Sequence, residues 1–171
     1  MSSEMSSEMS SEMSSEMSGE MSAMNGPYQG AASHAVATIH PDAWTAPFWK
    51  AARRHRLVAA RCTECARFQV PPTGFCPVCR SRSVEWIELS GVATIYSFTI
   101  VRHAVVPSEI DTVPYVLGVV SLADAGGAKL MTNIVDCDPN TVAIGQRVEV
   151  VWDDIDDDVT IPRFTPVVGA G

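Results

Sequence analysis

The sequence predicts a mostly β protein with an N-terminal helix, a small module built on four cysteines and a five-stranded barrel. Three observations predict this fold. Thr45 and Pro47 mark a helix start, because threonine caps helices and proline suits the first turn. Four cysteines form two C-x-x-C pairs between residues 62 and 79. After residue 91, five short segments alternate apolar and polar residues with the period of a β-strand.

The helix is expected within residues 41–56 and should end near Arg54. Its apolar contacts would come from Phe48, Trp49 and Ala52, with the basic residues toward solvent. His55 stands where the helix should stop. A histidine can adopt the left-handed conformation of a helix end, although less readily than glycine.

Residues 57–90 are predicted to form a zinc ribbon, in which strands at 57–61, 68–72 and 84–89 surround two cysteine knuckles. The spacing C-x2-C-x10-C-x2-C can place four thiolates at the corners of one tetrahedron, which is the arrangement of closed structural zinc sites. Such a site binds one ion, has no open position and activates no water. The predicted ligands are Cys62, Cys65, Cys76 and Cys79.

Two other uses of these cysteines are possible. A disulfide framework suits short secreted chains, but the sequence shows no secretory signal. A redox site needs one C-x-x-C at a strand-to-helix junction, whereas this chain has two in register. Cys137 lies far from the pairs, and we expect it to be a small buried hydrophobic residue.

Residues 91–168 are predicted to form the barrel. Its first strand would place Val92, Tyr96, Phe98 and Ile100 on one face. Further strands are expected at 115–122, 129–135, 147–152 and 160–167. Residues 138–145 should form one helical turn between the third and fourth strands. Five strands with this interruption indicate a closed barrel of the OB type.

Residues 1–40 look different from the rest of the chain. The first 16 residues repeat Met-Ser-Ser-Glu, and residues 25–40 are rich in alanine, glycine and serine. We expect a disordered low-complexity tract and linker, because it has little apolar surface to bury. Since every repeat offers an initiator methionine, an over-long gene start is an alternative reading.

Charge is distributed unevenly along the chain. The net charge is −8, yet eight of the twelve basic residues lie between Lys50 and Arg82, against the single acid Glu64. An acidic run at residues 153–158 is the opposite extreme. This balance disfavours generic nucleic-acid binding and permits a local site for a phosphorylated ligand. No apolar run is long enough to span a membrane, and zinc-binding thiolates need a reducing compartment, so we expect a cytoplasmic protein.

The sequence does not indicate an enzyme in its own right. No Ser/His/Asp order, nucleophile elbow, P-loop or dinucleotide fingerprint is visible. His103 could touch a ligand after a barrel strand, but a surface histidine is the simpler interpretation. The aspartates at 153–158 lack the glycine and terminal glutamate of an EF-hand loop.

The order of helix, ribbon and barrel resembles a family of small bacterial and archaeal proteins. In that family a rubredoxin-like zinc ribbon precedes an acyl-CoA-associated OB fold. The resemblance covers residues 47–167, and all four cysteines are in place. The other matching stretches are Pro47-Phe48-Trp49, Pro71-Pro72, Pro77-Val78, Gly91-Val92 through Thr99, Pro114-Tyr115-Val116, Asn133-Ile134-Val135, Ile144-Gly145 and Ile161-Pro162. His55 departs from the pattern, since the family often has glycine there.

The resemblance implies a non-catalytic accessory subunit. Its partner would be a thiolase-like enzyme, an aldolase or a hot-dog-fold acyl-CoA hydratase, in lipid or steroid-type acyl-CoA metabolism. Coenzyme A carries phosphates and an adenine ring, so a site for it needs fixed positive charge and a stacking surface. Candidate ligand or partner residues are Phe48, Trp49, Arg53, Arg56 and Arg61. The alternative is a single-stranded nucleic-acid binder, because OB folds also bind nucleic acids.

Overall fold

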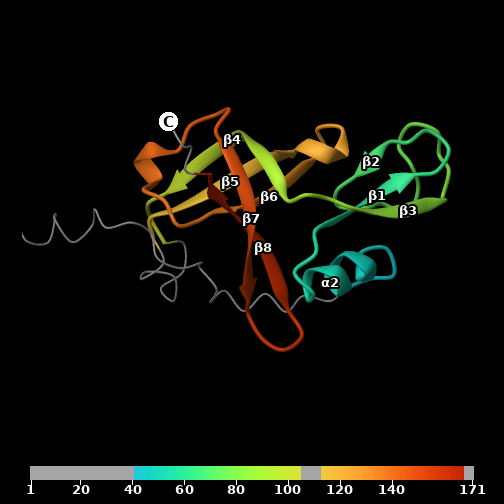
Figure 1. Ribbon diagram of the computed structural model, residues 1–171, viewed down its shortest axis with the longest axis horizontal. Coiled ribbons are helices and arrows are strands. Elements are labelled where there is room, and N and C mark those ends of the chain that lie inside the picture. Colours follow the sequence, from blue (N-terminus) through green and yellow to red (C-terminus); the bar gives the residue numbers. More distant parts are fainter. Residues whose placement is uncertain (1–40, 105–112, 168–171) are drawn as a thin grey trace, which may run out of the picture.

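Helix, ribbon and barrel follow one another along the chain in the computed structural model, which describes residues 41–104 and 113–167 (Figure 1). The tract at 1–40, expected to be disordered, lies outside the described residues. In the described part, no helix is both long and apolar enough to cross a membrane. The predicted fold class is confirmed: the protein is mostly β, with one N-terminal α-helix and a closed five-stranded barrel.

Helix α2 (Ala46–Ala52) begins as predicted at Thr45 and is slightly shorter than expected. The capping contact differs from the prediction. The Thr45 hydroxyl does not accept a hydrogen bond from the helix; it donates to Asp42 Oδ1 at 2.8 Å and accepts from the Asp42 backbone N–H at 3.2 Å. Asp42 Oδ1 also accepts from the backbone N–H of Thr45, at 2.7 Å, and of Trp44, at 3.0 Å. His55 has a φ of 54°, so it does take the left-handed conformation after the helix.

The ribbon is a three-stranded antiparallel sheet of order β2-β1-β3. Its strands are β1 (Val58–Cys62), β2 (Phe68–Gln69) and β3 (Val84–Glu88). The first knuckle connects β1 to β2, and the second knuckle lies between β2 and β3. In the β1–β3 register, Arg61 lies directly opposite Glu85 and Val58 opposite Glu88.

The barrel closes in the order β4-β5-β6-β8-β7. Its strands are β4 (Val92–Val101), β5 (Tyr115–Leu122), β6 (Lys129–Ile134), β7 (Arg147–Asp154) and β8 (Thr160–Pro166). The short helix η2 (Ala123–Ala125) precedes β6, and η3 (Pro139–Thr141) lies between β6 and β7. Asp138 caps η3 by accepting from the backbone N–H of Asn140 at 2.9 Å, as the Asp-Pro sequence predicted.

One apolar core joins the two modules. Inside the barrel, the largest fully buried side chains include Ile95, Leu122 and Phe164. Leu57 and Ala59, from the ribbon side, and Leu89, which precedes β4, belong to the same buried cluster. Because the cluster is continuous, the ribbon and the barrel share part of the stabilisation that comes from burying apolar surface.

The prediction that Val92, Tyr96, Phe98 and Ile100 share one face of β4 is wrong over the first half of the strand. The register with β5 shifts between Ile95 and Ser97, which marks a β-bulge at Tyr96. Before the bulge, Ala93 and Ile95 are buried, whereas Tyr96 is 58% exposed. After it, Phe98 and Ile100 lie on one face, as predicted, and this face packs against the core. The extra residue exchanges the two faces of the strand, which an unbroken two-residue period does not foresee.

Candidate metal centre and the helix-ribbon groove

The two knuckles fold in nearly the same way. In the first, the Cys62 carbonyl accepts from the Ala66 N–H and the Cys62 N–H donates to the Arg67 carbonyl, both at 2.9 Å. In the second, Cys76 makes the corresponding bonds with Arg80, at 2.9 Å, and Ser81, at 2.8 Å. Both turns close on a residue in the left-handed region, with φ of 59° at Ala66 and 63° at Arg80.

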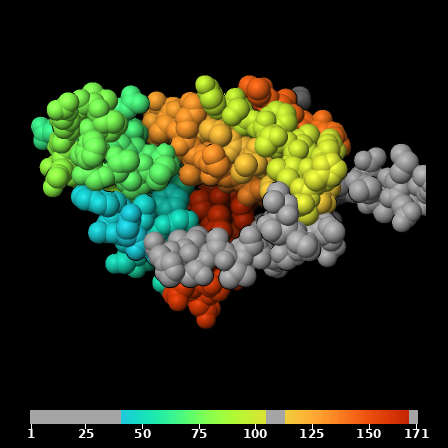
Figure 2. Space-filling view, turned by 180° about the vertical axis from the view of Figure 1, so that it is seen from behind, coloured from blue at the N-terminus to red at the C-terminus, as the bar shows by residue number. Residues whose placement is uncertain are grey.

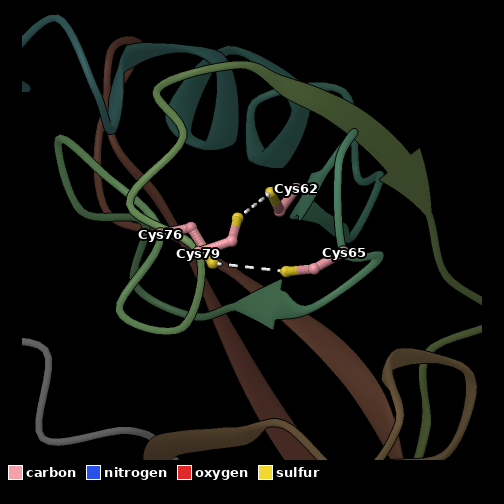
Figure 3. A group of neighbouring side chains, drawn as sticks. All are labelled: Cys62, Cys65, Cys76 and Cys79. Carbon is pink, nitrogen blue, oxygen red and sulfur yellow. Dashed lines mark hydrogen bonds between the residues drawn. The ribbon is translucent and has the colours of Figure 1, made fainter.

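These turns aim four sulfur atoms at one point (Figure 3). All four Sγ atoms lie within 4.8 Å of one another, and the Cys62–Cys79 and Cys65–Cys76 pairs are each 3.5 Å apart. A tetrahedral zinc site with Zn–S bonds of about 2.3 Å has sulfurs about 3.8 Å apart. The cysteines are not paired as disulfides. They form a site for one structural zinc ion.

The backbone prepares this site for a cation. Hydrogen bonds from the backbone N–H groups of Cys79 and Val78 lower the pKa of the Cys76 thiol to about 6. The backbone N–H of Cys65 likewise lowers the pKa of Cys62. At Cys79, the backbone N–H of Ser81 lowers the pKa, but desolvation and the other three thiols outweigh it and raise the value to about 12. A bound divalent cation would offset the cost of ionising these neighbouring thiols, because its positive charge stabilises four thiolates at once.

The arginines considered as ligand residues are each paired within the chain. Arg53 contacts Asp158 at 3.1 Å, and Arg61 contacts Glu85 Oε1 through Nη2 at 2.8 Å. Arg56 forms an ion pair with Glu88. The aromatic pair is also partly enclosed: Phe48 packs against the buried core, and Trp49 meets it edge-on at 5.1 Å between ring centroids. The structure therefore does not gather the five residues into one site.

A groove between α2 and the ribbon is lined by one of these five candidate residues, Arg56. It has a volume of about 300 Å³. Arg56 lies on its wall together with Lys50 and Arg54, for which no carboxylate lies within ion-pair distance in the described parts of the chain. Trp86 supplies a half-buried aromatic surface. Trp86 was not among the ligand or partner residues predicted from the sequence, because only the pairing of β1 with β3 brings it beside the helix. The remaining lining residues are Pro47, Ala51, Val58 and Glu88.

The acidic run is held against the helix end. His55 Nε2 lies 3.0 Å from Asp154 Oδ1, and the His55 ring stacks on Trp152 with centroids 5.5 Å apart. Arg53 also donates to the Asp157 carbonyl at 2.9 Å. The acidic residues around the β7–β8 turn therefore pair with the basic helix, and Figure 1 shows this hairpin beside α2.

Cys137 and His103 take no part in the metal centre. The Cys137 side chain is half-buried against the core, and this burial raises the pKa of its thiol to about 11. A raised thiol pKa disfavours the reactive thiolate. His103 is exposed at the end of β4.

The fold and the cysteine site define a two-module protein, in which a structural zinc ribbon precedes an OB-type barrel. Comparison with known proteins identifies the family. Residues 49–85 match the model of the ChsH2 rubredoxin-like zinc ribbon domain, and residues 86–153 match that of the ChsH2 C-terminal OB-fold domain. The chain belongs to this ChsH2 family, also called DUF35.

Three relatives illustrate the match. A DUF35 domain-containing scaffold protein of Methanocaldococcus jannaschii is 36% identical over 61% of this chain and 73% of its own length. A probable enoyl-CoA hydratase alpha subunit of Thermomonospora curvata is 35% identical over 71% of this chain, which spans only 37% of that longer relative. A solved structure described as an Ltp2-ChsH2(DUF35) aldolase matches with 32% identity and a TM-score of 0.68, covering 76% of this chain and 99% of the other.

Proposed function

We propose that this protein is a non-catalytic accessory subunit that docks onto a thiolase-like enzyme, an aldolase or a hot-dog-fold acyl-CoA hydratase. One observation carries the proposal. The chain aligns with 99% of a ChsH2(DUF35) chain from a structure described as an aldolase together with Ltp2. Two similar proteins are described as a scaffold protein and as a hydratase alpha subunit, and both descriptions are of proteins that work together with other chains.

The side chains of the described residues support a structural role. The four-cysteine site is closed and offers no position for a substrate or a reactive water. Of the described histidines, His55 is paired with Asp154 and His103 is exposed without a described base or nucleophile partner. Within residues 41–104 and 113–167, no Ser, Thr or Cys side chain is hydrogen-bonded to a histidine; the Thr160 hydroxyl donates to Asp154, the same carboxylate that holds His55.

Exposed apolar side chains offer contacts for the partner enzyme. Phe75 and Val78 at the second knuckle are 55% and 62% exposed. Tyr96 and Met131, on the outer face of the barrel, are 58% and 67% exposed. Large apolar residues at the centre of an interface contribute strongly to binding, so these two regions are the surfaces we expect a partner to cover.

We further propose that the helix-ribbon groove binds the phosphates of an acyl-CoA. Lys50 and Arg54 have no ion-pair partner among the described residues and can contact phosphate, and Arg56 adds a third cation that Glu88 holds in place. Trp86 could stack on the adenine ring. Arg53 and Arg61 are weaker candidates for binding phosphate, since each already forms an ion pair with an acidic residue of the chain.

The nucleic-acid alternative receives less support. OB folds bind single strands with the face of their second and third strands and the loops beside it. Here the loop between the fourth and fifth barrel strands carries Asp156, Asp157 and Asp158, which repel phosphates. Arg163 is buried and paired with Asp153 at 3.2 Å, and Phe98 points toward the core and cannot stack.

Co-purification tests the accessory role. A tagged copy is isolated from its native host at moderate salt without chelator, and bound proteins are identified by mass spectrometry. A stoichiometric thiolase-like enzyme, aldolase or hydratase supports the proposal. Nucleic acid that leaves with salt would favour the alternative instead.

Calorimetry tests the coenzyme A site. K50E and R54E should each weaken binding of coenzyme A, while R147E, which makes the same change of charge at an exposed position outside the groove, should not. Equal weakening in all three variants would mean that general charge, not the groove, attracts the ligand.

A further inference from the structure

A second groove lies where the ribbon meets the barrel. It has a volume of about 590 Å³ and is lined by the first knuckle and β2 on one side and by η2, its turn and the start of β6 on the other. Figure 2 shows the segment around η2 and β6, in orange, against the green ribbon. The lining residues are Ala66, Arg67, Phe68, Val70, Ala125, Gly126, Gly127, Ala128 and Lys129.

We propose that this groove binds a phosphorylated small molecule, with the phosphate between Arg67 and Lys129 and the organic part against Phe68 and Val70. This inference goes beyond the proposed function and does not depend on it, because it concerns a different groove and a different set of cations.

The charge of the groove favours an anion. Arg67 and Lys129 line it, and no acidic residue does. Neither cation forms an ion pair in the described parts of the chain. By contrast, Arg53, Arg56, Arg61 and Arg163 all do. Two cations without an ion pair to any described carboxylate thus line one concave site, where they focus the field on a ligand.

Neutral contacts hold Lys129 in place. Its ammonium group donates to the Gly127 carbonyl at 3.1 Å and lies 4.1 Å from the centroid of the Tyr96 ring. Neither contact neutralises the positive charge, so this charge remains available to a bound anion. Arg67 adds a planar group that can bind two phosphate oxygens at once.

Small residues keep the wall between the cations open. Gly126 and Gly127 both have positive φ, of 57° and 75°, and a Cβ atom at Gly126 would meet the Phe68 ring at 3.9 Å. Without side chains there, the backbone of this turn stays uncovered, and ligand oxygens can approach it closely. The positive φ values favour glycine at both positions, and the same choice leaves this wall of the groove without side chains.

The size and the walls of the groove indicate the rest of the ligand. A volume of about 590 Å³ lies within the range of small-molecule sites and exceeds what one phosphate needs. Phe68 and Val70 are half-buried and contribute apolar surface beside the cations. A phosphate monoester with a compact apolar or aromatic group fits both features.

Titration of the full zinc-loaded protein with phenyl phosphate, followed by calorimetry at low salt, tests this inference. We expect saturable binding of one molecule, tighter than that of inorganic phosphate because the ring contacts Phe68. R67E and K129E should each raise the dissociation constant at least about tenfold, since each removes a charged hydrogen-bond donor and adds repulsion.

R80E is the matched control. Arg80 is an exposed knuckle arginine without a described ion pair, outside the groove, and R80E changes the net charge equally. The R80E variant should bind phenyl phosphate as tightly as the unchanged protein does. The zinc content of every variant is measured, because a four-thiolate zinc site is itself anionic and attracts nearby arginines. No binding at tens of millimolar phenyl phosphate, or equal loss in R80E and R67E at full zinc content, would overturn the proposal.

Discussion

Single residues decide whether the metal centre forms. Cys62 and Cys76 are fully buried, whereas Cys65 and Cys79 are exposed, so each knuckle supplies one inner and one outer ligand. The C-x-x-C spacing allowed this centre to be predicted, because the knuckle turn follows from local sequence. The ion pairs of Arg56 and Arg61 were not predicted. They depend on strand register, which brings Glu88 and Glu85 to them from 24 or more residues away.

C62S should release zinc and unfold the ribbon. Removing one of four thiolates leaves an incomplete tetrahedron, and metal binding supplies much of the folding free energy of such modules. Zinc content by mass spectrometry and thermal melting report the loss. C137S is the control, since this half-buried thiol lies outside the cluster and should leave zinc in place. Full zinc content and an unchanged melting curve in C62S would contradict the four-cysteine assignment.

A66G should stabilise the protein by up to about 1 kcal/mol. A non-glycine residue in the left-handed region costs about 1–2 kcal/mol, and the greater freedom of glycine in the unfolded chain offsets part of that gain. Ala66 has a φ of 59°. The measurement is urea unfolding with saturating zinc. A143G, at an exposed position without positive φ, should instead destabilise slightly; equal effects in both variants would count against the backbone argument.

At the scale of elements, β4 shows where sequence patterns fail. Its length and position were predicted well, but the bulge at Tyr96 was not. The residue before the bulge bonds to a segment distant in sequence: the Ile95 N–H donates to the Gln146 carbonyl, and the Gly145 N–H donates to the Ile95 carbonyl. Both partners lie about fifty residues away along the chain, so no local pattern contains this information.

The bulge predicts different costs for two aromatic truncations. F98A should destabilise by about 2–4 kcal/mol, because Phe98 packs against the core and its loss leaves a cavity. Y96A should cost less than about 1 kcal/mol, since Tyr96 is 58% exposed and contacts Lys129 only through a cation–π interaction. Chemical denaturation measures both. Similar costs would mean that Tyr96 and Phe98 share one face of β4, as the unbroken alternation predicted.

At the scale of the whole molecule, two modules with different sources of stability share one core. The ribbon sheet is small, and β2 has only two residues, so it depends on the metal. The barrel has its own buried cluster, to which Leu57, Ala59 and Leu89 attach the ribbon. The order of modules was predictable from the sequence. The grooves beside α2 and η2 were not, because they arise where segments distant in sequence meet.

Zinc removal should therefore unfold the molecule in part. With a chelator, amides of residues 58–88 should lose protection from hydrogen exchange, because no metal ion then links the four cysteines of the two knuckles. Amides of β5 and β6 should stay protected, since Val116, Val120 and Ile134 are buried in the barrel core together with barrel residues such as Ile95 and Phe164. The barrel should still exchange faster than with zinc, because Leu57 and Ala59 leave its core when the ribbon unfolds.

Mass spectrometry of peptides from the intact chain, with and without chelator, measures this. If all segments lose protection together, ribbon and barrel form one cooperative unit, and the metal stabilises the barrel as directly as it does the ribbon.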